Sequence, residues 1–396
     1  MSRSGGSRRP VWFAWVGLAA LMNVGAAPAF VSPNRPAVTL GLFVPTRGAA
    51  GEVGREVARG AEIAVAIANR DGGIEGRPVN LATASSDLSW EAATGSLVRL
   101  IYEEKAVAVI GALDGRSGHV AEQVITRARG EAIFVTSWAS EETLTRIRIP
   151  WFFSVVPDDR DQASALAGEI FSARRIERAA VWVEASFDAH AAAQSFAQAA
   201  PPGAVTSFDA RESGSREELI ARAGRGEYGC VVMFAQPKAA VDLAGRLRSG
   251  GFRGQLAGPL WLASPEYLRG GRATEGTLLV APARGRTRVI KEFNTIFLGA
   301  HGALPTPPAL YSHDAVRVLV EALRGAGAPS GVSLGRMLEE RSTWGLTGIV
   351  RFDERRGRDE APTIARVEAG RLVALRGARN SAQGITRTGS GVARDQ

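Results

Sequence analysis

The sequence predicts an α/β protein built as two doubly wound lobes, each on a parallel sheet. Short apolar runs alternate with amphipathic stretches from residue 38 to about residue 300. This alternation is typical of parallel strands covered by helices on both faces. The strands are too many for one compact unit, and a chain of 396 residues is long enough for two separate cores.

The first crossover carries the clearest local signals. The run VTLGLFV at 38–44 predicts a strand, and apolar residues at helical spacing predict a helix over 51–69. Gly72 or Gly73 can adopt the left-handed backbone that ends a helix. Alternation over 79–84 then predicts a second strand, which closes a right-handed β-α-β unit.

The remaining elements continue this order along the chain. Further strands are expected at 106–111, 132–136, 151–156, 179–184, 204–208, 229–234 and 276–281. Further helices are expected at 89–103, 117–128, 160–173, 188–199, 238–249, 287–299 and 310–325. The C-terminal stretch 377–396 has little apolar content and is expected to be disordered.

The N-terminus has the three parts of a secretory signal peptide. Arg3, Arg8 and Arg9 precede the apolar run VWFAWVGLAALM, and 27–29 supply a small-x-small cleavage site. The apolar run is short for a membrane span, and no cysteine follows it for lipid attachment. Residues 1–29 are therefore predicted to be removed, which places the mature protein in the periplasm. A retained N-terminal anchor is the alternative.

Charge and cysteine content argue against two further classes of protein. The formal charge is +8, but the signal region holds +3 and the tail +2, and the other arginines are scattered. Such a surface does not indicate nucleic-acid binding. Cys230 is the only cysteine, so no internal disulfide is possible. Its apolar strand predicts a buried core residue.

No motif specifies catalysis, a cofactor or a metal. The stretch GRGEYG at 224–229 matches a dinucleotide fingerprint, but it follows a helix and enters a strand, the reverse of the required order. The four histidines are far apart and lack zinc-site spacing. We therefore expect no enzyme, no cofactor and no metal site.

Two predicted strand ends are candidate binding loops. Gly115 and Arg116 follow the strand that ends at Gly111, and 137–140 follow the next strand. Ligands of open parallel sheets bind beyond the carboxyl ends of strands, and free amides at helix starts attract anions. Ordinary helix capping explains the same residues, so the residues alone leave both interpretations open.

Six segments carry a family resemblance over about 38–376. They are VTLGLFVPTRG, GREVARGAEIAVAIANRDGGIEGRPVNL, VAVIGAL, IFVTSWASEETLT, WFFSVVPDDRDQASALA and TGIVRFDERRGRDEAP. Their order resembles the leucine/isoleucine/valine-binding protein family, the type I periplasmic solute-binding proteins of ABC transporters. The resemblance implies a monomer whose two lobes are joined by three hinge crossings and close on a small ligand, which a permease then receives.

The resemblance also implies lobe limits and a set of pocket residues. Lobe I would hold 37–157 and 282–350, and lobe II would hold 158–281 and 351–376. The positions that match the family's ligand-binding residues, or could strengthen its grip on an anion, are Arg47, Gly115, Arg116, Trp138, Ala139, Ser140, Asp159, Phe187, Gln236 and Leu260.

The departures from the family pattern concern the ligand's amine. Leu260 falls where amino-acid binders place the carboxylate that holds the ammonium, and Phe187 lacks a tyrosine's hydroxyl. A buried ammonium without a carboxylate partner is costly. We therefore expect a small carboxylate with an apolar or aromatic body and no free α-amine. A clamshell sensor that signals to a regulatory partner is the alternative function.

Overall fold

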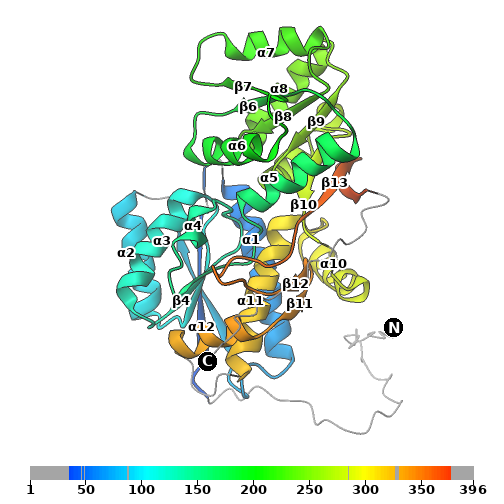
Figure 1. The fold of residues 1–396 in the computed structure, drawn as a ribbon. Coiled ribbons are helices and arrows are strands. Elements are labelled where there is room, and N and C mark those ends of the chain that lie inside the picture. The colour runs from blue at the N-terminus through cyan, green and yellow to red at the C-terminus, as the bar shows by residue number, and fades with distance from the viewer. Residues whose placement is uncertain are drawn as a thin grey trace, which may run out of the picture.

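The computed structural model describes residues 35–375 except 46, 49, 87–88, 284 and 326–329. The predicted signal peptide and the predicted tail at 377–396 lie outside the described residues. Figure 1 shows two lobes, one above the other, each with a central sheet. In the part of the chain that is described, no helix combines the length and the apolar character needed to cross a membrane.

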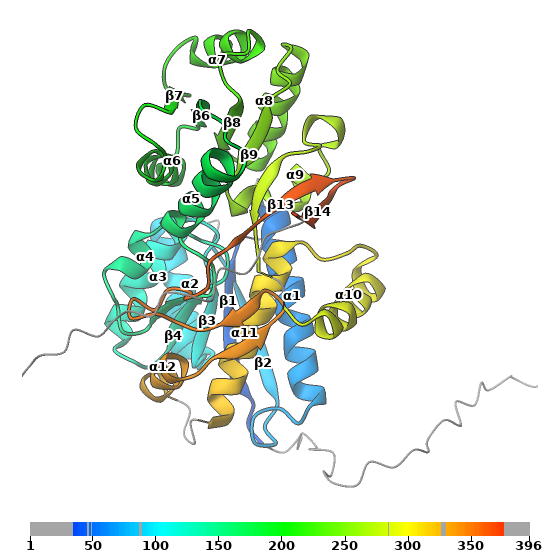
Figure 2. The same ribbon diagram turned by 45° about the vertical axis from the view of Figure 1, so that its right-hand side comes forward.

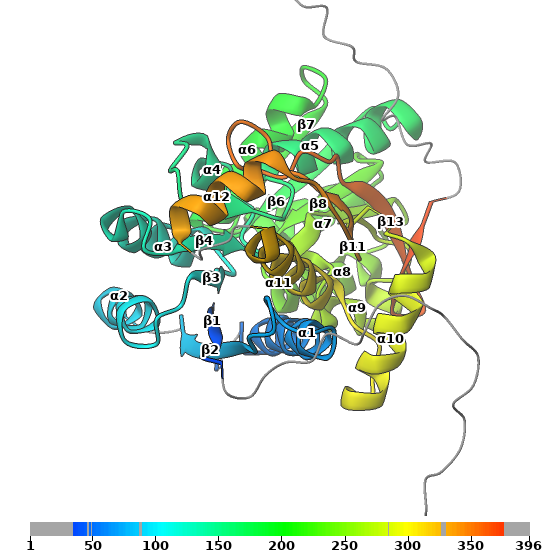
Figure 3. The same cartoon turned by 90° about the horizontal axis from the view of Figure 1, so that it is seen from below.

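Lobe I is the part built on a five-stranded sheet of order β2-β1-β3-β4-β5. Every neighbouring pair in it is parallel. Seen from below, α2 and α3 lie on one side of this sheet and α1 and α11 on the other (Figure 3). Its strands are β1 (Val38–Val44), β2 (Val79–Ser85), β3 (Ala108–Gly111), β4 (Ile133–Thr136) and β5 (Phe152–Ser154).

The helices of lobe I come from both ends of the chain. Helix α11 packs along α1, although the two are far apart in sequence. The helices are α1 (Gly51–Arg70), α2 (Trp90–Val98), α3 (Gly115–Ala128), α4 (Thr143–Arg146), α10 (Thr287–His301), α11 (Pro307–Gly325) and α12 (Gly331–Glu340). The short strands β11 (Thr343–Gly345) and β12 (Gly348–Val350) pair with each other beside α11.

Lobe II is the part built on a seven-stranded sheet of order β14-β13-β10-β9-β8-β6-β7. Its strands are β6 (Ala179–Val183), β7 (Val205–Asp209), β8 (Cys230–Phe234), β9 (Gln255–Gly258), β10 (Leu278–Ala281), β13 (Thr363–Glu368) and β14 (Arg371–Ala374). Its helices are α5 (Asp159–Ala167), α6 (Phe187–Ala199), α7 (Ser215–Gly224), α8 (Pro237–Ser249) and α9 (Pro265–Leu268).

The predicted α/β class with parallel-sheet lobes is confirmed, with one antiparallel edge added. Strand β13 runs antiparallel to β10 and pairs with β14. Ala369 and Gly370 join these strands with φ values of 47° and 74°, the left-handed pair that a two-residue hairpin turn requires. Figure 2 shows this hairpin at the edge of lobe II.

The predicted first crossover is also confirmed. Gly72 and Gly73 have φ values of 90° and 65°, and the Gly73 N–H donates to the Ala68 carbonyl at 2.8 Å. Ile74 is buried behind this turn. Helix α1 therefore ends in the left-handed turn that its glycines allow.

The chain passes between the two sheets three times: after β5, after β10 and after β12. A buried polar network lies at two of these connections. Asp314 of α11 accepts the N–H groups of Leu346 and Thr347 at 2.7 and 2.8 Å, and the Thr347 hydroxyl at 2.6 Å. Arg358 donates to the carbonyls of Val155 and Thr347 at 3.0 and 2.7 Å. The network therefore joins the stretch after β5 to the stretch after β12.

Cys230 lies in the middle of the lobe II sheet. It has no exposed surface, and burial raises the pKa of its thiol. The predicted core position is confirmed.

Candidate ligand-binding site

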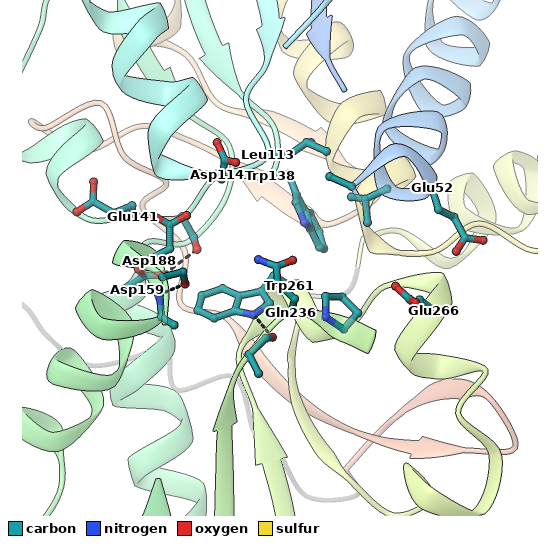
Figure 4. Close-up of a pocket in the computed structure, with 17 residues that line it drawn as sticks. Glu52, Leu113, Asp114, Trp138, Glu141, Asp159, Asp188, Gln236, Trp261 and Glu266 are labelled. Carbon is teal, nitrogen blue, oxygen red and sulfur yellow. Dashed lines mark hydrogen bonds between the residues drawn. The ribbon is translucent and has the colours of Figure 1, made fainter. Parts of the chain in front are cut away.

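A pocket lies between the two lobes (Figure 4). Almost every segment that lines it follows the carboxyl end of a parallel strand, where open α/β sheets bind ligands. From lobe I the lining residues are Ala50, Glu52, Val53, Leu113, Asp114, Trp138, Ser140 and Glu141. From lobe II they are Asp159, Ser186, Asp188, Ala189, Ala235, Gln236, Pro237, Trp261 and Glu266.

Each lobe contributes one indole ring to the pocket. Trp138 follows β4 and is tilted against Tyr311, with ring centroids 6.2 Å apart. Trp261 lies in the short 3₁₀ turn Leu260–Leu262, and its Nε1–H donates to the Ala235 carbonyl at 2.9 Å. Each ring is thus held by contacts within its own lobe. Together they offer large flat surfaces to an apolar or aromatic ligand.

Among the described residues, side chains make polar contacts across the cleft at three places. The Ser140 hydroxyl donates to Asp159 Oδ1 at 2.7 Å, and the Gly115 N–H donates to Asp188 Oδ2 at 2.9 Å. Glu52 of α1 pairs with Arg269, which follows α9. Since Gly115 is the first residue of α3, the carboxylate of Asp188 occupies the positive end of that helix.

The pocket is acidic. Six of its lining side chains carry a carboxylate, and no lysine, arginine or histidine lines it within the described chain. Three of these carboxylates have partners elsewhere. Asp114 accepts the Ser117 N–H at 2.7 Å, Glu141 lies 3.2 Å from His119, and Glu52 pairs with Arg269.

His119 is the cation that compensates Glu141. Its ring also contacts Glu122 at 2.5 Å. The hydrogen bonds to Glu122 and Glu141 raise the pKa of His119 to about 10. This histidine is therefore charged at neutral pH and is already engaged by two carboxylates.

Asp159 and Asp188 are different. Asp159 is 2% exposed, and its Oδ2 has no hydrogen-bond partner in the described structure. Burial raises the pKa of Asp159 well above its ordinary value, against the opposing hydrogen bond from Ser140. Burial also raises the pKa of Asp188, against the opposing Gly115 N–H. The charge of Asp188 also raises the pKa of Asp159, and the charges of Asp114 and Glu141 raise the pKa of Asp188.

Four of the predicted site residues line this pocket: Trp138, Ser140, Asp159 and Gln236. Gly115 and Ala139 are buried beside it without lining it. Arg47 and Arg116 are exposed and lie outside the lining.

Phe187 and Leu260 were predicted to contact the ligand, but neither lines the pocket. The Phe187 side chain is 67% exposed, and Leu260 is 1% exposed within the lobe II core. Their neighbours Asp188 and Trp261 line the pocket instead.

Two premises of the predicted anionic ligand are therefore wrong. The Gly115 amide is bonded to Asp188 and is not free. Leu260 does not mark an empty ammonium site, because its side chain is outside the lining while carboxylates are inside it. Asp188 is one of the lining residues that sequence reasoning missed. Its signal was the Ser186-Phe187-Asp188 segment between a strand and a helix, the same pattern that singled out the two lobe I loops.

The fold and the site define a two-lobed α/β binding protein with its pocket between the lobes. The chain belongs to the periplasmic binding protein family, whose model matches residues 37–371. No curated protein matches the chain.

Solved structures match the fold over most of the chain. A leucine binding protein from Thermotoga maritima is 19% identical, with a TM-score of 0.76, over 86% of this chain and 98% of that one. A branched-chain amino acid transporter substrate binding protein from Streptococcus pneumoniae, solved with isoleucine, is 17% identical, with a TM-score of 0.75, over 85% and 98%. A solute binding protein from R. palustris, solved with benzoate, is 19% identical, with a TM-score of 0.69, over 86% and 95%.

Proposed function

We propose that this protein is an exported solute-binding receptor of an ABC uptake transporter, and that it binds its ligand without chemical conversion. The observation that carries the proposal is the lining of the pocket, which both lobes supply from the carboxyl ends of their strands. A ligand held there contacts both lobes at once. Its binding energy therefore favours the closed arrangement over an open one.

The motion we propose is a hinge closure about the three connections. The predicted lobe limits after 157, 281 and 350 fall within or beside the connections that follow β5, β10 and β12. A permease that recognises both lobes would then distinguish the closed shape from the open one. The amino-terminal segment is proposed to direct export, and N-terminal sequencing of the mature protein tests that part.

We infer that the ligand has an apolar or aromatic body, because one indole from each lobe lines the pocket. The relatives solved with isoleucine and with benzoate carry bodies of both kinds. The carboxylate predicted from the sequence has less support, since an anion would enter an acidic pocket that no cation lines among the described residues.

A thermal-shift screen over amino acids, amines, organic acids and aromatic acids tests the receptor function. A ligand bound only by the folded state raises the melting temperature. The same ligand is expected to reduce the radius of gyration in solution scattering. If no compound of any class raises the melting temperature, or if a saturating ligand leaves the scattering profile unchanged, the clamshell receptor is contradicted.

A further inference from the structure

The cleft contains a pair of acids whose charges are only partly compensated. Asp159 uses one carboxylate oxygen to accept the Ser140 hydroxyl, and its other oxygen is buried and has no hydrogen-bond partner among the described residues. Asp188 accepts the Gly115 N–H at 2.9 Å. A buried carboxylate oxygen without a donor is costly. Something that donates hydrogen bonds and carries positive charge would remove this cost.

Among the described residues, no lysine, arginine or histidine lines the pocket beside these two acids. The charged groups that raise the pKa of Asp159 most are Asp188, Asp158 and Glu141, all acidic. Those that act on Asp188 are Asp114, Glu141 and His119. His119 is already held by Glu122 and Glu141. A ligand that carries a positive charge would supply the missing compensation.

We propose that the ligand is a small amine whose ammonium group is held by Asp159 and Asp188, while Trp138 and Trp261 contact its apolar body. This inference rests on the receptor function proposed above and specifies its ligand. Three N–H donors of an ammonium suit the free oxygen of Asp159 and the remaining acceptor capacity of Asp188. A cation next to the indole faces gains further attraction.

A carboxylate on the ligand is not required by this site. The α3 N-terminus is where a ligand carboxylate would be attracted, but the Asp188 carboxylate already binds there through Gly115. The Cβ of a larger residue at Gly115 would lie 2.6 Å from Asp188 Oδ1, which shows how closely the two approach. The carboxylate of Asp188, from lobe II, thus occupies the position at the start of α3 where the carboxylate of an acidic ligand would bind.

A metal ion fits the site less well than an amine. Within the described residues, no group of three or more histidine, cysteine, aspartate or glutamate side chains is arranged to hold one. Asp159 and Asp188 approach the pocket from α5 and α6 of one lobe (Figure 4). The opposite wall there includes the indole of Trp138 and the carboxylates of Asp114 and Glu141. Those two carboxylates are already bound by the Ser117 N–H and by His119.

Two matched series of compounds test the proposal with the wild-type protein. The first is leucine, isopentylamine, which lacks leucine's carboxylate, and 4-methylpentanoate, which lacks its amine. The second is phenylalanine, phenethylamine and 3-phenylpropanoate. By calorimetry, at least one of the two amines is expected to bind at least about tenfold more tightly than its matched acid.

Binding of the amine is expected to be linked to proton release. Burial keeps protons on Asp159 and Asp188 to a higher pH than usual, and an ammonium favours their ionised forms. The affinity for the amine should therefore rise as pH rises from acidic to neutral. Calorimetry in buffers of different ionisation enthalpy measures the released protons directly.

Asp188→Asn and Asp159→Asn test the two acids. Each is expected to weaken amine binding at least about tenfold and to leave binding of the matched acid unchanged or stronger. Asp242→Asn, an exposed aspartate on α8 that pairs with Arg246, is the matched control and should change nothing. Asp188 is only partly buried, so D188N gives a folded test even if D159N does not fold.

The outcomes separate this inference from the receptor function. If an acid of either series binds more tightly than its amine, or if D188N binds the amine as the wild type does, the amine inference is overturned and the receptor function stands. If none of the six compounds binds, the inference is overturned for these small amines. Only the wider thermal-shift screen then decides whether the protein is a receptor.

Discussion

Asp314 and Asp159 are two buried carboxylates that differ in how fully the protein satisfies their hydrogen bonds. Asp314 lies in the network behind the connections between the lobes and accepts three hydrogen bonds from Leu346 and Thr347. Asp159 lies in the cleft and accepts one from the Ser140 side chain, and its other oxygen has no partner in the part of the chain that is described. Burial would raise the pKa of both, but the partners of Asp314 lower its pKa overall, while the pKa of Asp159 stays raised.

The comparison separates a structural acid from a binding acid. A carboxylate whose hydrogen bonds are all made inside the protein stabilises the fold and has nothing left for a ligand. A carboxylate kept partly unsatisfied costs stability in the free protein and recovers that cost when a ligand binds. The predictions below test this contrast from its largest expected effect to its smallest.

The largest effect is expected for Asp314→Ala. The substitution leaves two backbone N–H groups and one hydroxyl unpaired in the interior, beside buried Arg358. Removing one partner from a buried charged network costs on the order of 3–5 kcal/mol. Urea unfolding should show this as a lower midpoint. D314N, which keeps the size and one acceptor, should lose less, and an unchanged midpoint in D314A would refute the structural role.

Asp159→Asn is expected to stabilise the ligand-free protein, in contrast to Asp314→Ala. A neutral amide is less costly to bury than a carboxylate, so at neutral pH the unfolding free energy should rise by up to about 1 kcal/mol. Because the pKa of Asp159 is raised in the folded state, wild-type stability falls as pH rises from the unfolded value through the folded one. The gain in D159N should therefore grow with pH. If D159N is less stable than the wild type at every pH, Asp159 is a structural acid like Asp314 and the contrast between them is refuted.

The smallest effect is expected at the third contact across the cleft. Glu52 and Arg269 join the lobes at the surface, with side chains 37% and 65% exposed. Exposed ion pairs contribute roughly 0.2–1 kcal/mol and are screened by salt. Glu52→Gln should shift the melting temperature by little and only at low ionic strength. A large shift of the melting temperature that does not depend on salt would mean that the Glu52–Arg269 pair contributes more to the contact between the lobes than Asp159 and Asp188 do.

Local patterns predicted the fold well because they act over short stretches. The helix over 51–69 and its glycine turn needed only apolar spacing and residues that tolerate positive φ. Strands β9, β11, β12, β13 and β14 were not predicted. The residues of β9, Gln-Leu-Ala-Gly, are too few for a periodic signal, and the β13–β14 hairpin depends on pairing with β10, which lies far back in the chain.

The site was harder to predict because its key contacts join distant segments. The Gly115–Asp188 bond connects residues 73 positions apart, and no local pattern encodes it. Family matching selected Phe187 and Leu260, and the structure places their next neighbours in the pocket. One position on an α-helix turns the side chain by about 100°. A shift of one residue in the family alignment therefore selects exposed Phe187 in place of Asp188, whose carboxylate bonds to Gly115 across the cleft.

The burial of Cys230 has a practical consequence for measuring the opening and closing of the cleft by fluorescence. The only thiol of the chain is sealed inside β8, and its raised pKa disfavours the reactive thiolate. Maleimide dyes should thus leave the folded wild-type protein unlabelled. A cysteine introduced at exposed Phe187, between two residues of the pocket wall, would be the sole attachment point for a fluorophore. Its emission would then report each opening and closing in real time, without any background from the native sequence.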